Sequence, residues 1–138
     1  MHPPSTKSHG LRIVVTDDNP VVLATLVQML VKEGHAVFAA YDGQSACELA
    51  EYIPDVDLVI SNTRMCNVKI PDLIVQVRAA KPWLAILHIG DPLPSTGPLA
   101  NVPSLREPFS SEELVAAISS LIAQERHGTR PDGAGRPI

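Results

Sequence analysis

The stretch that decides the fold is LRIVVTDDNP, residues 11–20. It begins with a short apolar run rich in β-branched residues, which is typical of a strand covered on both faces. Two aspartates follow, and then come Asn19 and Pro20, which suit the N-cap and the first position of a helix. The stretch therefore predicts a buried strand that ends in a polar turn and leads into a helix.

The same unit of strand and helix recurs along the chain. Apolar residues at helical spacing follow Pro20, and Gly34 is expected to end this first helix. Further strands are predicted at 35–40, 57–61 and 84–89, and further helices at 44–53, at 71–80 and from Ser110, where Glu113 completes a capping box. This alternation predicts a doubly wound α/β fold, in which a five-stranded parallel sheet carries helices on both faces.

One segment departs from the alternation. Residues 91–105 contain four prolines and a glycine. Proline removes a backbone donor and clashes with the preceding helical turn, so a full helix cannot form there. We therefore expect a shortened or missing fourth helix, in a loop of at most one helical turn, followed by a short fifth strand at about 102–105.

Composition limits the class of protein. The 138 residues fit one domain, and 45% hydrophobic with 19% charged residues is typical of a soluble globular chain. No apolar run approaches the roughly 20 residues of a membrane span, and no signal peptide is evident, so we expect a cytoplasmic protein with no membrane partner. The net charge of −4, without a cluster of Lys or Arg, argues against binding to nucleic acid.

The ends of the chain are expected to lie outside the folded domain. Residues 1–10 hold prolines and no apolar pattern, which predicts a flexible leader, and the Gly- and Pro-rich residues 125–138 predict a disordered tail. The folded domain is thus predicted at 11–124. Cys47 and Cys66 are too few for a metal cage and are expected to be free thiols.

The histidines and known catalytic motifs give no sign of an enzyme. His88 lies within the predicted fourth strand, which favours a hydrogen-bonded core residue over a catalytic base. His35 falls near the turn before the second strand, and no sequence neighbour pairs with it. The sequence contains neither a nucleotide-binding fingerprint nor a hydrolase nucleophile motif.

Three motifs carry a resemblance to a known family. RIVVTDDNP, DLVISNTRM and REPF occur in this order, and with the repeated α/β unit they resemble the receiver domain of two-component response regulators over residues 12–122. The resemblance implies a flavodoxin-like (βα)5 fold. It also implies an acidic pair that binds Mg²⁺, an aspartate after the third strand that accepts a phosphoryl group from phosphohistidine, and a hydroxyl and a lysine that bind the phosphoryl oxygens.

The chain keeps the first of these parts and departs from the others. Asp17 and Asp18 match the acidic pair. Asn62 stands at the acceptor position, and an amide has no anionic oxygen with which to form an acyl phosphate. Gly90 stands at the hydroxyl position, and Glu107 replaces the phosphate-binding lysine with an anion. These departures predict a degenerate receiver, or pseudo-receiver, that is not phosphorylated at the usual site.

Three carboxylates without a matched cation also pose a problem of charge. Asp17, Asp18 and Glu107 would repel one another at close range, which raises the pKa of at least one of them or requires a counter-ion. Arg64 and Arg106 are the candidates for that counter-ion, unless Glu107 points outward.

Two functions from different classes follow from this pattern. The first is a non-enzymatic, phosphorylation-independent signalling module that contacts a histidine kinase, a phosphotransferase, a downstream effector or a second copy of itself through its last helix, Ser110–Ala123. The second is a metal-dependent small-ligand binder or enzyme, in which Asp17 and Asp18 hold Mg²⁺ with help from the Asn62 amide oxygen and Glu107. Alternatively, the acidic pair serves only as a structural cap on the loop that enters the first helix.

Overall fold

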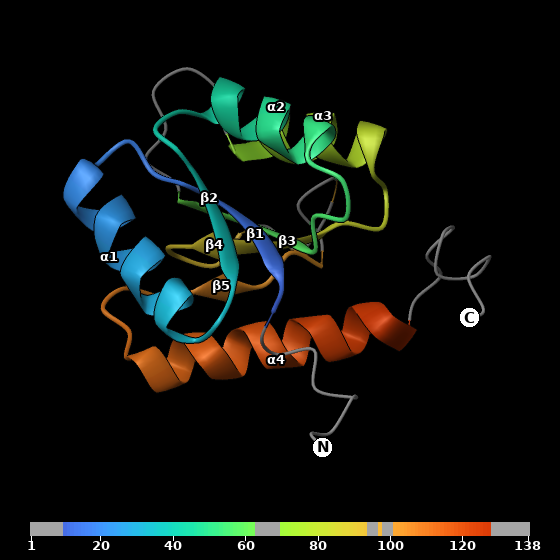
Figure 1. Cartoon of the computed structure of the whole chain (residues 1–138). Helices are drawn as coiled ribbons and strands as arrows, with labels where there is room; N and C mark the ends of the chain where they lie inside the picture. Colours follow the sequence, from blue (N-terminus) through green and yellow to red (C-terminus); the bar gives the residue numbers. More distant parts are fainter. Residues whose placement is uncertain (1–9, 63–69, 94–96, 98–100, 128–138) are drawn as a thin grey trace.

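The computed structural model describes residues 10–62, 70–93, 97 and 101–127. Within these residues strands and helices follow one another along the chain almost as the sequence predicts (Figure 1). The elements are β1 (Arg12–Thr16), α1 (Pro20–Lys32), β2 (Ala36–Ala40), α2 (Gly43–Tyr52), β3 (Leu58–Asn62), α3 (Ile70–Ala80), β4 (Ala85–Ile89), β5 (Ser104–Leu105) and α4 (Ser111–His127).

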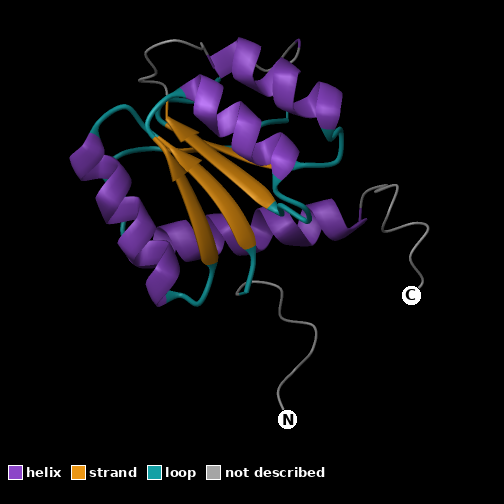
Figure 2. Ribbon diagram, turned by 45° about the horizontal axis from the view of Figure 1, so that its top comes forward, coloured by secondary structure: helices purple, strands orange, loops and turns teal. Residues whose placement is uncertain are grey.

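The five strands form one parallel sheet in the order β2-β1-β3-β4-β5. The sheet lies between two layers of helices, with α1 and α4 on one face and α2 and α3 on the other (Figure 2). This is the doubly wound α/β fold that the sequence predicts. In such sheets the carboxyl ends of the strands meet at one edge, which is where sites form.

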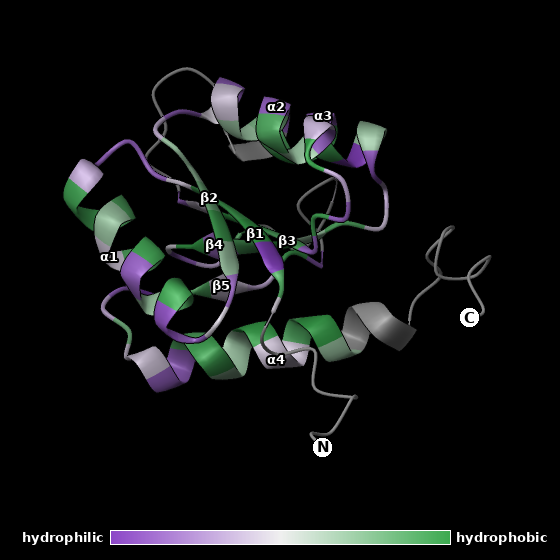
Figure 3. Ribbon diagram, viewed as in Figure 1, coloured by the Kyte–Doolittle hydropathy of each residue, from purple (hydrophilic) through white to green (hydrophobic). Residues whose placement is uncertain are grey.

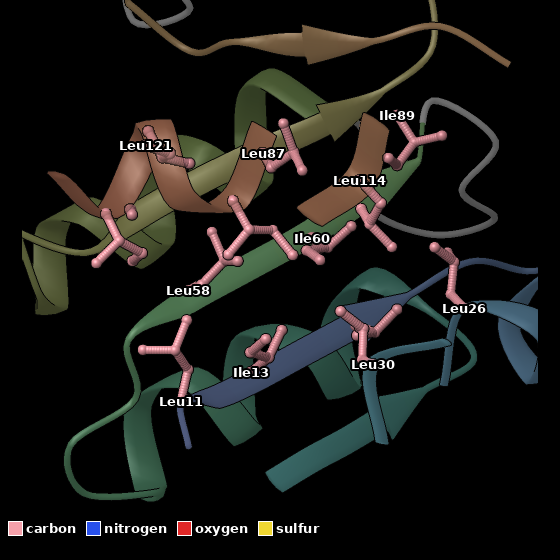
Figure 4. Close-up of a cluster of buried hydrophobic side chains, with 14 of the residues drawn as sticks. Leu11, Ile13, Leu26, Leu30, Leu58, Ile60, Leu87, Ile89, Leu114 and Leu121 are labelled. Atoms are coloured by element: carbon pink, nitrogen blue, oxygen red, sulfur yellow. The ribbon is translucent and has the colours of Figure 1, made fainter. Parts of the chain in front are cut away.

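The core follows from the alternation of side chains along each strand. In β1, Ile13 and Val15 belong to the cluster under α1 and α4, whereas Val14 belongs to the cluster under α2 and α3. The strands are therefore hydrophobic on both faces, while each helix also carries hydrophilic residues (Figure 3). In the first cluster, side chains from the strands meet those of α1 and α4 (Figure 4). Each buried Leu or Ile contributes about 1.5–3 kcal/mol relative to exposure.

The predicted caps of the first and last helices are confirmed. The side-chain oxygen of Asn19 accepts hydrogen bonds from the backbone N–H groups of the first turn of α1. Gly34 follows α1 with a φ of 93°, a left-handed conformation that favours glycine. At α4, the Ser110 N–H donates to Glu113 Oε1 at 2.8 Å and the Glu113 N–H donates to Ser110 Oγ at 3.1 Å.

The described residues between β4 and β5 form no regular helix, as the prolines predict. Among these residues, only Gly97 takes a helical conformation, and that is a single 3-10 position. Leu93 and Val102 pack against the hydrophobic cluster under α2 and α3. The strand that follows is shorter than expected, since β5 has two residues.

The predicted domain boundaries at 11 and 124 stay a prediction. Helix α4 continues to His127, so the predicted end of the domain at 124 falls inside it. The predicted leader and tail lie outside the described residues, apart from Gly10 and the end of α4. Cys47 is a buried free thiol, as expected, and Cys66 lies outside the described residues. None of the described helices combines the length and apolar character needed to cross a membrane.

Candidate functional site

The predicted polar site lies where β1 and β3 end. The parallel register pairs Thr16 with Ser61, so the next residues, Asp17 and Asn62, leave neighbouring strands at the same level. Both are enclosed, because Asp17 is 0% and Asn62 is 1% exposed. The fold thus brings the first aspartate of the acidic pair and the asparagine together, as the topology predicts.

Asp17 already has a structural role in this place. Its Oδ1 accepts a hydrogen bond of 2.8 Å from the backbone N–H of Asn19, the residue that caps α1. The Asp17 carboxylate therefore closes the turn that leads into the helix, near the positive end of the helix dipole. Asp18 is half-buried beside it. The sequence did suggest a capping role for the pair, and the two-residue spacing from Asp17 to Asn19 is the Asx-turn pattern that specifies it.

Asn62 ends β3 in register with Ile89 on β4. Its side chain is a neutral amide at the position where the resemblance to receiver domains would place an aspartate nucleophile. An amide oxygen can accept hydrogen bonds or contribute a weak bond to a cation, but it does not attack phosphorus to form an acyl phosphate.

Gly90 has a backbone reason to be glycine. It follows β4 with a φ of 145°, a conformation that residues with side chains rarely adopt. Its N–H donates to the carbonyl oxygen of Leu105 at 2.9 Å, which holds β4 against β5. A serine or threonine at this position would strain the chain, and sequence reasoning alone did not find this constraint.

Glu107 and Arg106 answer the question of charge raised by the sequence. Glu107 is exposed and precedes Pro108 through a cis peptide bond. Arg106 Nε lies 3.9 Å from Asp91 Oδ1, and these side chains are 71% and 91% exposed, so the pair is screened by solvent. Glu107 is thus an exposed carboxylate, whereas Asp17 is fully buried. Arg64 lies outside the described residues.

The donor set at the edge suits a hard cation only in part. Mg²⁺ is bound through one or two carboxylates and water, and Asp17, Asp18 and the amide oxygen of Asn62 are oxygen donors of this kind. Within the described residues, however, no three or more His, Cys, Asp or Glu side chains gather into a group that could hold a metal ion. The hypothesis that Glu107 adds a third carboxylate therefore receives no support.

The buried histidines are structural. His88 is 1% exposed, and its Nδ1 lies 3.0 Å from Ser104 Oγ, which confirms the predicted hydrogen-bonded core histidine. Burial lowers the pKa of His88, and the negative charge of Asp91 opposes this shift. His35 Nδ1 accepts a hydrogen bond of 3.2 Å from the backbone N–H of Leu11, a partner 24 residues away that the sequence did not indicate.

The described cysteine is not a nucleophile at neutral pH. Cys47 lies on the buried face of α2, and burial raises the pKa of its thiol to about 11, with smaller contributions from Glu51 and Glu48. The thiolate is the reactive form, so Cys47 stays inert.

Solved structures show what this arrangement resembles. A response regulator receiver domain protein (CheY-like) from Methanospirillum hungatei JF-1 matches with a TM-score of 0.75 and 16% identity, covering 85% of this chain and 97% of its own. The receiver domain of the hybrid histidine kinase CckA matches with a TM-score of 0.68 and 24% identity, covering 80% and 98% of the two chains. The fold is that of a response regulator receiver domain. At these identities the likeness establishes the receiver fold alone.

Sequence comparison adds a weaker likeness. No family model matches the chain. Over 117 residues it is 26% identical to the transcriptional regulatory protein TcrA of Mycobacterium tuberculosis H37Rv. This match covers 81% of the chain and 46% of TcrA, so the chain spans about half the length of that relative. The match therefore corresponds to one part of TcrA.

Proposed function

We propose that this chain is a receiver module of two-component signalling that works without phosphorylation at the strand edge and acts by binding another protein. The observation that carries the proposal is the buried Asn62 at the end of β3, beside the position of Asp17. An amide there leaves the receiver fold without its nucleophile.

The surroundings of Asn62 support the same conclusion. Phosphoryl transfer depends on groups that bind and neutralise the phosphoryl oxygens. At the matched positions this chain has Gly90, which carries no side chain, and the exposed anion of Glu107. Neither can bind a phosphoryl oxygen as a hydroxyl or a lysine does, so a phosphoryl group would gain little stabilisation here even if another residue accepted it.

The last helix is the proposed contact surface. Helix α4 has 17 residues, and its inner face packs on the sheet through Leu114 and Ile118. The exposed positions recur at helical spacing and form one outer face, made of Glu112, Ala116, Ser120 and Ala123. We propose that this face meets a histidine kinase, a phosphotransferase, a downstream effector or a second copy of the chain. Among the similar proteins, CckA is a hybrid histidine kinase and TcrA is a transcriptional regulatory protein. Both descriptions belong to signalling proteins of the classes proposed here as partners.

We propose no enzymatic activity. The hypothesis of a metal-dependent enzyme or ligand binder rests on Asp17 and Asp18, and Asp17 is already used to close the turn into α1. No further observation among the described residues favours it.

Incubation with acetyl phosphate and Mg²⁺, followed by intact mass spectrometry, tests the proposal. We expect the wild-type mass to stay unchanged under conditions in which an ordinary receiver domain, run in parallel, gains one phosphoryl group. A phosphoryl group on the wild-type chain that peptide mapping places on Asp17 or Asp18 would overturn the proposal.

A further inference from the structure

An open groove lies between the C-terminal end of α1 and the first turns of α4. Its volume is about 370 Å³. The two helix ends that form it lie side by side on the same face of the sheet (Figures 1 and 2). The residues that line it are Glu33, which follows α1, and Ser111, Glu112, Val115 and Ala116 from α4.

The groove is lined by acidic and apolar residues. Glu33 and Glu112 bring two carboxylates to it, while Val115 and Ala116 are apolar. The C-terminal end of α1 adds partial negative charge from its last carbonyl groups. Lys32 precedes Glu33, but the residues that line the groove include no Lys, Arg or His. The groove therefore favours an occupant that carries positive charge.

Residues 1–9 leave the fold next to this groove. The N–H of Gly10 donates to the carbonyl oxygen of Gly34 at 3.2 Å, and Gly34 directly follows Glu33. Gly10 has a φ of +76°, while a Cβ there would meet no atom within 4 Å, so glycine is needed for the turn of the backbone and not for lack of space.

The composition of residues 1–9 matches the charge of the groove. The segment contains Lys7, His2 and His9, and it has no Asp or Glu. From Gly10 back to Lys7 the chain spans up to about 10 Å when extended. A chain of that length is long enough to span from Gly10 to Glu33, which is one residue from the contact between Gly10 and Gly34.

We propose that residues 1–9 dock into the groove between α1 and α4, with Lys7 against Glu33 and Glu112. The docked segment covers the N-terminal half of the outer face of α4. Three observations support the docking: the opposite charges of the groove and the segment, the length of the segment, and the contact of Gly10 with Gly34 beside the groove. Its consequence, that the segment competes with a protein partner for α4, rests on the function proposed above.

A spin label tests the docking directly in the full chain. Ser5→Cys carries the nitroxide in a Cys66→Ser background, and Cys47 does not compete for the reagent because it is buried and its pKa is raised to about 11. We expect strong paramagnetic broadening of the amide signals of Glu33 and Ala116. Signals of Gln44 and Glu48 on α2, on the opposite face of the sheet, should keep their intensity.

Charge variants show whether the broadening comes from the proposed contact. Lys7→Glu lies outside the described fold and should lower the ratio of docked to undocked chains by roughly two- to five-fold, as expected for one exposed ion pair. Combining Lys7→Glu with Glu33→Lys and Glu112→Lys should restore the broadening. Glu48→Lys is the matched control on α2 and should change nothing. Salt of about 1 M, where the Debye length is about 3 Å, should weaken the docking.

Three outcomes would overturn the proposal. The first is equal broadening at the groove and at α2, and the second is broadening that does not respond to Lys7→Glu. The third comes from mixing a spin-labelled chain with an isotope-labelled chain that has no spin label. Broadening of the groove signals in that mixture would assign the groove to the segment of a second copy, and its absence supports docking within one chain.

Discussion

His88 and Ser104 connect the last two strands through their side chains. His88 Nδ1 lies 3.0 Å from Ser104 Oγ, and the two residues are partners in the register of β4 and β5. Because β5 has two residues, few backbone hydrogen bonds hold it, among them those to the N–H groups of His88 and Gly90. The side-chain contact therefore helps to fix the edge strand, whose Leu105 also packs against the hydrophobic cluster under α1 and α4.

The buried state of His88 predicts a dependence of stability on pH. Burial lowers the pKa of His88, with opposition from Asp91, so the unfolded chain takes up a proton at a higher pH than the folded chain. Above the ordinary histidine pKa of about 6.5 both states are neutral and the full stability is present. As the pH falls below that value, the free energy of unfolding should drop by up to about 1.4 kcal/mol per pH unit until the folded-state pKa is reached.

Urea unfolding measured between a pH of about 7.5 and about 5.5 checks this prediction. His88→Gln cannot titrate, while His35 and all carboxyl groups are the same in both proteins. The wild type should lose more stability on acidification than His88→Gln. Equal losses would show that His88 does not carry the effect.

Restoring a carboxylate at the acceptor position should destabilise the chain. Asn62→Asp places a second charge in a buried position beside Asp17, and the cost should be about 3 kcal/mol, the scale of an uncompensated buried charge. Millimolar Mg²⁺ should recover part of this loss in Asn62→Asp and less in the wild type, because two buried carboxylates bind a divalent cation better than one carboxylate and an amide. Thermal unfolding with and without Mg²⁺ measures both effects.

Asn62→Asp alone should also fail to make the structure of α4 respond to acetyl phosphate. Gly90 and Glu107 would still stand where the resemblance predicts a hydroxyl and a lysine, so we expect the amide signals of α4 to stay unchanged after incubation with acetyl phosphate. Asn101→Asp adds the same charge at an exposed position and should affect neither stability nor Mg²⁺ response. Full stability of Asn62→Asp without Mg²⁺, or shifted α4 signals after acetyl phosphate, would contradict this account.

A hydroxyl at Gly90 should be costly for a reason of backbone geometry. Gly90→Thr forces a β-branched residue into a φ of 145°, and strain of this kind costs on the order of 1–3 kcal/mol. Asp91→Ser changes the next residue, which is exposed and makes a screened contact with Arg106, so it should change stability by less than about 0.5 kcal/mol at neutral pH. Urea unfolding of the two variants makes the comparison, and equal stability would show that the backbone relaxes at Gly90.

The features that could be predicted from sequence are those set by neighbouring residues. Asn19 and Pro20 start α1, and Ser110 with Glu113 starts α4, because these contacts span four residues or fewer. The prolines of residues 91–105 likewise exclude a helix through local geometry. The meeting of Asp17 and Asn62 at one edge follows from the rule that parallel strands share their carboxyl ends.

The rest depended on contacts between distant parts of the chain. His35 accepts a hydrogen bond from Leu11, and His88 meets Ser104, and neither spacing is visible as a local pattern. The strained φ of Gly90 arises from its contact with β5. The exposure of Glu107 also depends on where the chain runs after β5, which charge arithmetic alone does not indicate.

The capping box of α4 should control how firmly the proposed contact helix is held. Ser110→Ala removes the oxygen that accepts from the Glu113 N–H at 3.1 Å, and loss of such a cap costs about 0.5–2 kcal/mol. Ser120→Ala is the matched control, because it makes the same chemical change at an exposed position inside α4, where alanine is the better helix former. Urea unfolding should show a loss for Ser110→Ala and no loss for Ser120→Ala. Hydrogen exchange should also speed up in the first turn of α4 in Ser110→Ala. An unchanged exchange rate there would mean that packing of Leu114 and Ile118 on the sheet, and not the cap, fixes the start of the helix.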